Sequence, residues 1–333
     1  MDDGFGGFNS AFRLTDEGKI ILEAVTPQSL PQEPIIKSLK KKGTPLYLAI
    51  IWHQHQPRYY KDLQTGESFA PWVRLHGIKD YYDMAAILYQ YPKIKFTINL
   101  TPVLLMQLQD AIKLYDEGKS PDVAYRMTLK NADSLTYEDK KYLLENFFSA
   151  SWDNMIDIYP RYKELRTKRV FNPDGTINFD ESIKRYTVQD FRDLQVYFNL
   201  CWFDPDFKTG EATLPTGEKV SVKKFIDKAR NFSEKDKKEI LDIQMKILKA
   251  IIPVHVDLQN RGQIEIITTP YYHPILPLIY DTESAREAMP NAILPERFSW
   301  PEDADWHVKK AVEKYTEIFG RKPEGMWPAE GSV

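Results

Sequence analysis

The sequence predicts an α/β protein built on a parallel sheet, with a large helical insertion between two of its strands. Short apolar runs typical of strands buried on both faces recur along the chain. Segments with helical periodicity separate them, as the crossover connections of a parallel sheet require. The segment at about residues 105–260 is mostly helical and charged in pattern, and it is far too long for a simple loop.

Composition divides the 333 residues into two parts. Residues 1–45 begin Gly-rich, continue through Pro27, Pro31 and Pro34, and then reach a lysine-rich run. Their low apolar periodicity predicts a partly disordered extension. Residues 46–333 carry the strand and helix patterns and are long enough to bury a large core.

Four segments have the pattern of parallel strands. Residues 46–52 are apolar throughout, which predicts a first strand buried on both faces. Residues 94–99 and 263–268 are the second and third candidates, and Met326 and Trp327 would belong to a fourth.

Helix signals lie between these strands. Residues 80–91 have one apolar face, and Ser233, followed by a carboxylate three residues on, predicts the start of a long helix. Gly262 is expected to end that helix just before the third strand. A last helix is expected to be capped by Asp303 and ended by Gly320.

The composition excludes several classes of function. A formal net charge of −3 gives no electrostatic case for a nucleic-acid or anionic-membrane partner. Cys201 is the single cysteine, so no internal disulfide framework is possible. The first 30 residues show no basic segment followed by an apolar one, and no apolar run reaches the length of about 18 residues that spans a membrane. We therefore expect a cytoplasmic protein.

Aromatic residues make up 13% of the chain, with 7 Trp and 19 Tyr. Such residues usually build an ordinary core, and composition alone favours that explanation. Tyr and Trp rings also line carbohydrate clefts, because the C–H faces of sugars pack on aromatic rings.

Several polar side chains follow the predicted strands. His53 and His55 come directly after the first strand and alternate onto one side of the chain. Two imidazoles this close can chelate a metal or bind polar groups of a ligand, unless one is a hydrogen-bonded structural histidine. Trp72 and His76 lie in the loop that follows, where they face a ligand or only hold the loop in place.

The third strand and the loop after it carry further candidates. Glu265 stands among isoleucines, and a carboxylate buried there must be paired with a cation or face a polar cavity. Residues 270–278 contain three prolines, two tyrosines and His273, as in a rigid binding wall or a packed structural loop.

The last candidate is Glu330, which follows the fourth strand. Pro328 and Gly331 predict a tight turn around it, a geometry that presents a side chain at the edge of a sheet. Taken by itself, a Glu in such a turn is more simply explained as a solvated surface residue.

Together these segments resemble family 57 of the glycoside hydrolases. Residues 53–57 (HQHQP), 262–265 (GQIE) with 273–278 (HPILPL), and 325–332 (GMWPAEGS) follow one another in the family's order. That family includes α-amylases, amylopullulanases, 4-α-glucanotransferases and branching enzymes that act on α-glucans. The resemblance runs from about residue 46 to the end of the chain.

The resemblance implies a (β/α)7 barrel, similar to a distorted TIM barrel, and retaining chemistry. Glu330 matches the position of the nucleophile. The positions expected to contact an α-glucan substrate are His53, His55, Trp72, His76, Glu265, His273 and Trp327. No cofactor is implied.

One part of the family's pattern is missing. The second carboxylate, an acid/base Asp, belongs to a later motif, and no residue follows Val333. We therefore expect residues 46–333 to be the N-terminal portion of a barrel that lacks its C-terminal strands. We expect this chain to be inactive on α-glucans without a missing C-terminal portion.

Two other functions stay open. His53 and His55 at the end of a first barrel strand, with His273 as a third ligand, would also suit a metal-dependent, amidohydrolase-like hydrolase. A non-catalytic glucan-binding protein would keep the aromatic cleft without the acid catalyst.

Overall fold

A computed structural model describes residues 10–14, 20–24 and 46–332. The chain divides into two compact units, residues 1–48 and 49–333, which we describe separately. In the first unit, strand β1 (Ser10–Leu14) pairs antiparallel with β2 (Ile20–Ala24). The rest of the extension that we predict to be partly disordered lies outside the described residues.

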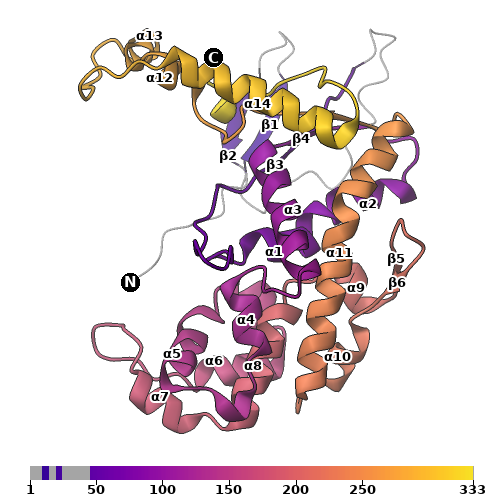
Figure 1. Cartoon of the computed structure of the whole chain (residues 1–333), viewed down its shortest axis with the longest axis vertical. Coiled ribbons are helices and arrows are strands. Elements are labelled where there is room, and N and C mark those ends of the chain that lie inside the picture. Colours follow the sequence, from indigo (N-terminus) through magenta and orange to yellow (C-terminus); the bar gives the residue numbers. More distant parts are fainter. Residues whose placement is uncertain (1–9, 15–19, 25–45, 333) are drawn as a thin grey trace. The chain divides into compact units, whose positions relative to one another are not determined.

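The second unit is a mixed α/β structure, mostly helical, around a small parallel sheet (Figure 1). Its strands are β3 (Ile51–Gln54), β4 (Phe96–Leu100) and β7 (Ile264–Ile267), in the order β3-β4-β7. Thr268 forms a further parallel bridge with Met326, next to β7. Three of the four predicted strands are therefore present, the fourth is reduced to a single bridge at Met326, and the described residues form no closed barrel.

The prediction that the first strand is buried on both faces over residues 46–52 is wrong. The strand begins only at Ile51, and Leu46 and Leu48 before it are 89% and 83% exposed. The physical reason is that β3 is an edge strand. No other strand pairs with its outer side in the described sheet.

The two faces of the sheet differ in chemistry. On one face Ile98 and Ile266 are buried, and α11 packs against β7. On the other face the register places His53 beside Asn99. Glu265 lies on that same face, two residues nearer the amino ends of the strands, where it pairs with Thr97. The polar face of the sheet thus carries the residues that sequence singles out.

Between β4 and β7 the chain is mainly helical. The longest helix, α11, packs against α3, α4 and α8, and this contact holds the core of the segment together (Figure 1). The elements are α3 (Pro102–Asp116), α4 (Val123–Leu129), η4 (Ala132–Ser134), α5 (Tyr137–Asn146), η5 (Trp152–Ile156), α6 (Pro160–Thr167), α7 (Phe179–Arg185), α8 (Val188–Leu200), α9 (Pro205–Thr209), β5 (Ala212–Thr213), β6 (Lys219–Val220), α10 (Lys223–Lys228) and α11 (Glu234–Asn260).

The long helix α11 begins and ends where sequence predicts. Ser233 and Asp236 form a reciprocal capping box at its start. At its end the backbone N–H groups of Gly262 and Gln263 bond to the carbonyls of Gln259 and Leu258. This is a Schellman motif, and the positive φ of 65° at Gly262 is the conformation that favours glycine there.

The last long helix, α14 (Pro301–Phe319), confirms one predicted boundary and corrects the other. Gly320 ends it with a left-handed φ of 70°. Asp303 does not cap it, because the helix begins two residues earlier at Pro301 and Asp303 lies in the first turn. Proline at a first helical position sets the backbone for the helix without needing a side-chain cap. The other elements that follow β7 are α12 (Leu276–Tyr280), η6 (Thr282–Ser284), α13 (Ala285–Ala288) and η7 (Ala329–Gly331).

The helix expected at residues 80–91 is segmented. Helix α1 (Trp72–His76) runs into a π-helical turn η2 (Gly77–Tyr81), and α2 (Asp83–Ala86) and η3 (Ile87–Gln90) follow. Single π turns of this kind are frequent at functional sites. No helix in the described residues combines the length and the apolar character needed to cross a membrane.

A buried arginine ties α1 to the helical segment. Arg74 is 1% exposed, and its guanidinium donates to both carboxylate oxygens of Asp122 at 2.7 and 2.9 Å. It also donates to Asn199 at 2.9 Å and to Gln244. Because these partners come from the start of α4, from α8 and from α11, the Arg74 side chain fixes the position of α1 against three helices of the segment.

Candidate active site

Three histidines from two strand ends meet at the carboxyl edge of the sheet. The ring centroids of His55 and His273 lie 4.3 Å apart with the rings stacked, and those of His53 and His273 lie 5.0 Å apart. His53 and His55 are 5.7 Å apart. The structure thus brings the predicted pair after β3 together with the predicted histidine after β7. We call these three residues the histidine site.

Residues at the end of β4 hold two of these rings in place. The side-chain amide of Asn99 donates to Nδ1 of His53 at 2.7 Å, and Oγ1 of Thr101 lies 3.3 Å from Nδ1 of His55. Sequence reasoning missed both Asn99 and Thr101. The signal was present in the second strand, where polar Asn99 interrupts an apolar pattern near the carboxyl end.

Glu330 reaches the histidine site from the turn η7, which follows the bridge between Met326 and Thr268. Its Oε1 lies 3.5 Å from Nδ1 of His273, whose side chain is only 4% exposed while that of Glu330 is 66% exposed. The carboxylate is therefore accessible from outside, with an imidazole next to one of its oxygens. Its exposure agrees with the simpler explanation of a solvated residue, and its position beside His273 agrees with the catalytic one.

Both partners of this contact have an unusual backbone. His273 has a φ of 59° and Glu330 a φ of 57°, in the left-handed region that costs a non-glycine residue free energy. Such strain persists where the surrounding structure enforces it, and it is concentrated at functional sites. Behind this turn, Gly325 lies so close to β7 that a Cβ atom there would come within 2.9 Å of Ile267.

The histidine site favours neutral imidazoles. Burial, followed by the charges of His273 and His53, lowers the pKa of His55 to about 4. Loss of solvent also lowers the pKa of His53 and of His273, and the nearby Glu330 carboxylate partly opposes this in both. At neutral pH these rings can therefore donate and accept hydrogen bonds without carrying charge.

A second aromatic group adjoins the histidine site through Tyr81. Its hydroxyl donates to the backbone carbonyl of His55 at 2.9 Å, and its ring lies 6.3 Å from that of His76. His76 in turn lies 5.0 Å from Trp202 and 6.4 Å from Trp72. Trp202 comes from the turn after α8, and no sequence pattern pointed to it.

The other predicted residues lie apart from this contact network. Glu265 is exposed, so among the described residues it is neither buried in an ion pair nor enclosed in a polar cavity, and the expectation of a buried carboxylate is wrong. The reason is that the polar face of the sheet is open at this level in the described residues. Trp327 is 37% exposed and donates its backbone N–H to Thr268 at 2.7 Å.

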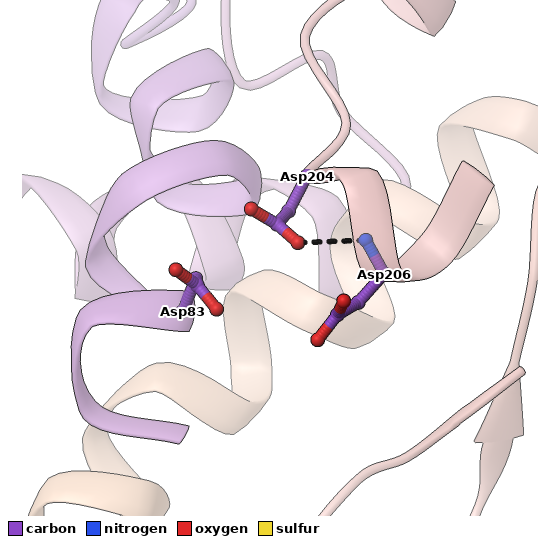
Figure 2. A group of neighbouring side chains, drawn as sticks. All are labelled: Asp83, Asp204 and Asp206. Atoms are coloured by element: carbon purple, nitrogen blue, oxygen red, sulfur yellow. Dashed lines mark hydrogen bonds between the residues drawn. The ribbon is translucent and has the colours of Figure 1, made fainter. Parts of the chain in front are cut away.

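Three carboxylates gather at a different place. Asp83 in α2 faces Asp204 and Asp206 at the start of α9, with one oxygen of each within 4.8 Å of the others (Figure 2). Burial, then repulsion from Asp204 and Asp206, raises the pKa of Asp83 to about 6. Oxygen donors of this kind suit Ca²⁺ or Mg²⁺. The Asp204 carboxylate also caps α9 by accepting from the N–H of Asp206 at 2.9 Å, which explains its position without an ion.

The histidines do not share that geometry. Among the described residues, Asp83, Asp204 and Asp206 bring three ligand atoms within 4.8 Å of one another, and no group containing His53, His55 and His273 does so. This geometry does not favour the metal-dependent alternative at the histidine site.

The fold is that of an α/β protein with a small parallel sheet, and the candidate site lies at the carboxyl edge of that sheet, where ligands bind in open α/β folds. Residues 49–333 match the profile described as Glycosyl hydrolase family 57. The chain belongs to this family. A comparison with curated protein sequences finds no match.

Three solved structures are similar to the chain. A family 57 branching enzyme from Thermococcus kodakaraensis, solved with glucose and additives, is 19% identical over 85% of this chain and 33% of its own, with a TM-score of 0.36. The α-amylase AmyC from Thermotoga maritima is 15% identical over 85% and 35%, with a TM-score of 0.34. A family 57 branching enzyme from Pyrococcus horikoshii is 18% identical over 85% and 34%, with a TM-score of 0.35. The chain spans about a third of the length of each.

Proposed function

We propose that this chain carries the nucleophile and part of the donor-sugar pocket of a retaining glycosidase or transglycosylase that acts on α-glucans. The observation that carries the proposal is the contact of 3.5 Å between Glu330 and His273, at the edge where His53 and His55 also lie. Membership of family 57 supports it. We also propose that residues 46–333 are the N-terminal portion of a (β/α)7 barrel whose inner face carries His53 and Glu265.

The reaction is a double displacement. A carboxylate oxygen of Glu330 attacks the anomeric carbon, forming a glycosyl ester as the bond to the leaving oxygen breaks. A second carboxylic acid protonates that leaving oxygen. Water, or the hydroxyl of another sugar, then attacks the ester with loss of a proton to the same group, which releases Glu330.

In this mechanism the histidine site binds the donor sugar. Neutral imidazoles at His53, His55 and His273 pair with sugar hydroxyls without placing extra positive charge beside the oxocarbenium-like transition state. The contact with His273 orients the Glu330 carboxylate toward the anomeric carbon. The strained backbone at both residues supports such preorganisation.

We propose that the acid/base group is not among these 333 residues. Since family 57 enzymes supply it from a later motif, we propose that the 333-residue chain is inactive on polysaccharides. A sugar fluoride tests attack by Glu330 separately from protonation of the leaving group, because fluoride leaves without needing a proton. The chain is therefore expected to take up a glucosyl group from 5-fluoro-α-glucosyl fluoride while releasing no reducing ends from amylose.

The test reads the mass of the intact chain and of its peptides after exposure to the fluoride. One glucosyl adduct on the peptide containing Glu330, absent in Glu330→Gln and retained in Glu324→Gln, which changes a nearby exposed carboxylate, is the expected result. An adduct on another carboxylate would overturn the assignment. Maltooligosaccharide binding without any adduct would instead favour the non-catalytic glucan-binding protein, and release of reducing ends from amylose would refute the proposed incompleteness.

A further inference from the structure

Three aromatic rings and an arginine form a separate group, which we call the aromatic platform. Its members are Tyr271, Tyr272, Trp306 and Arg58. The rings of Tyr272 and Trp306 are nearly parallel, at 21°, with centroids 6.1 Å apart. Tyr271 stands edge-on to both, with centroids 4.8 Å from Tyr272 and 5.6 Å from Trp306. Each ring is therefore braced by another.

The platform connects the same two chain segments that supply the histidines. Arg58 follows His55 by three residues, and Tyr272 directly precedes His273. Nη1 of Arg58 donates to the Tyr272 hydroxyl at 3.3 Å, and its Cζ lies 5.4 Å from the centre of the Tyr272 ring. The platform thus adjoins the histidine site along the chain, through Tyr272–His273 and through the segment from His55 to Arg58.

Helix α14 holds the outer part of the platform. The backbone N–H of Tyr271 bonds to the carbonyl of His307 at 3.1 Å, and that of Tyr272 to its Nδ1 at 3.3 Å. These bonds fix the loop against the first turns of α14, where Trp306 projects. The indole is 42% exposed although its neighbours hold it in position. A large ring that is both immobilised and exposed loses little entropy on binding a ligand.

We propose that the aromatic platform is a further sugar-binding subsite, which holds an α-glucan chain where it continues beyond the histidine site. This inference rests on the proposed function. The exposed indole of Trp306 offers an apolar surface for the C–H face of a pyranose ring. Arg58 and the Tyr272 hydroxyl offer hydrogen-bonding groups beside that surface, as sugar hydroxyls require. The occupant suited to alternating apolar and polar contacts is an uncharged oligosaccharide.

The test compares ligands of two lengths on the 333-residue chain. Maltose is short enough to be held by the histidine site alone, whereas maltoheptaose can reach the platform as well. Trp306→Ala is expected to weaken maltoheptaose binding about tenfold, which corresponds to about 1.4 kcal/mol, and to leave maltose binding unchanged. Isothermal titration calorimetry measures both affinities.

Matched variants keep the result interpretable. Trp300→Ala removes another exposed tryptophan at the start of α14, outside the platform, and is expected to bind like the parent. Trp306→Phe keeps a ring and should retain most of the affinity, and Arg58→Ala should weaken maltoheptaose binding with less change to the packing. Thermal unfolding confirms that each variant is folded.

Each outcome has a distinct meaning. If the parent binds maltoheptaose and Trp306→Ala binds it equally well, the platform is not a subsite and the proposed function stands. If the parent binds neither sugar, both proposals fail. If Trp306→Ala changes the sedimentation of the protein rather than its sugar affinity, the platform is an interface between copies and the subsite is refuted.

Discussion

Nδ1 of His273 lies 3.5 Å from Oε1 of Glu330, and both residues adopt left-handed backbone conformations, with φ of 59° and 57°. Two strained turns from distant parts of the chain therefore present their side chains to each other. A fold selected only for stability would place glycine or asparagine at such positions. The contact is the feature that most directly links the structure to a catalytic role.

This strain predicts that stability and function conflict at position 330. Glu330→Gly relieves the left-handed backbone and should be more stable than Glu330→Ala by about 1 kcal/mol, measured by urea unfolding. Both variants lose the carboxylate that we propose as the nucleophile. In whichever form of the protein turns over α-glucans, each should be slower by at least about a thousandfold. Equal stability of the two variants would show that the backbone at Glu330 is not strained.

The buried His255 predicts a pH-dependent stability. Burial lowers its pKa from 6.5 to about 4 in the folded chain. Below pH 6.5 the unfolded chain therefore binds a proton that the folded chain resists, and stability is lost as the pH falls toward 4. The shift corresponds to roughly 3 kcal/mol. Urea unfolding at pH 7 and pH 4 measures the loss.

His255→Gln is the variant for this prediction. It should reduce the loss of stability on acidification without abolishing it, because His53, His55 and His273 also have lowered pKa values. An unchanged pH dependence in His255→Gln would contradict the assignment.

The Arg74 network predicts a large effect from one substitution. Arg74→Ala leaves the Asp122 carboxylate buried without its cation and should destabilise the chain by about 3–5 kcal/mol. Arg74→Lys should also lose stability, since a single ammonium cannot replace the two parallel bonds. The matched control is Arg297→Ala, which breaks an exposed ion pair with Asp281 and should change stability little, because solvent screens such pairs.

A substitution in the carboxylate cluster is predicted to stabilise the chain, whereas Arg74→Ala destabilises it. The pKa of Asp83 is raised to about 6 in the folded chain, so its ionisation opposes folding progressively as the pH rises from about 4 to 6 and fully above that range. Asp83→Asn should therefore have a higher unfolding temperature than the parent at pH 8 and a similar one near pH 3.5. Asp153→Asn, at an exposed carboxylate, is the control. A lower unfolding temperature for Asp83→Asn at pH 8 would refute the repulsion argument.

Sequence patterns succeeded where structure depends on neighbours along the chain. The capping box at Ser233, the glycine ends of α11 and α14 and the order of the strands all follow from local periodicity and backbone preference. They failed where the burial of a residue depends on packing against segments that are distant in the sequence. The pattern at Leu46 and Leu48 predicts a buried strand, but no strand pairs with them among the described residues. Glu265 is predicted to be buried but is exposed on the polar face of the sheet.

By itself, the sequence determined the α/β class, the order of the strands and the membership of glycosyl hydrolase family 57, and it named His53, His55, His273 and Glu330 as candidates. The packing of the sheet and helices brings these four residues together, lets Asn99 bond to one ring, and holds the exposed Trp306 against Tyr271 and Tyr272. The reason is physical. Local preferences determine which elements form, whereas contacts between distant segments depend on how the sheet and helices pack, which no short pattern encodes.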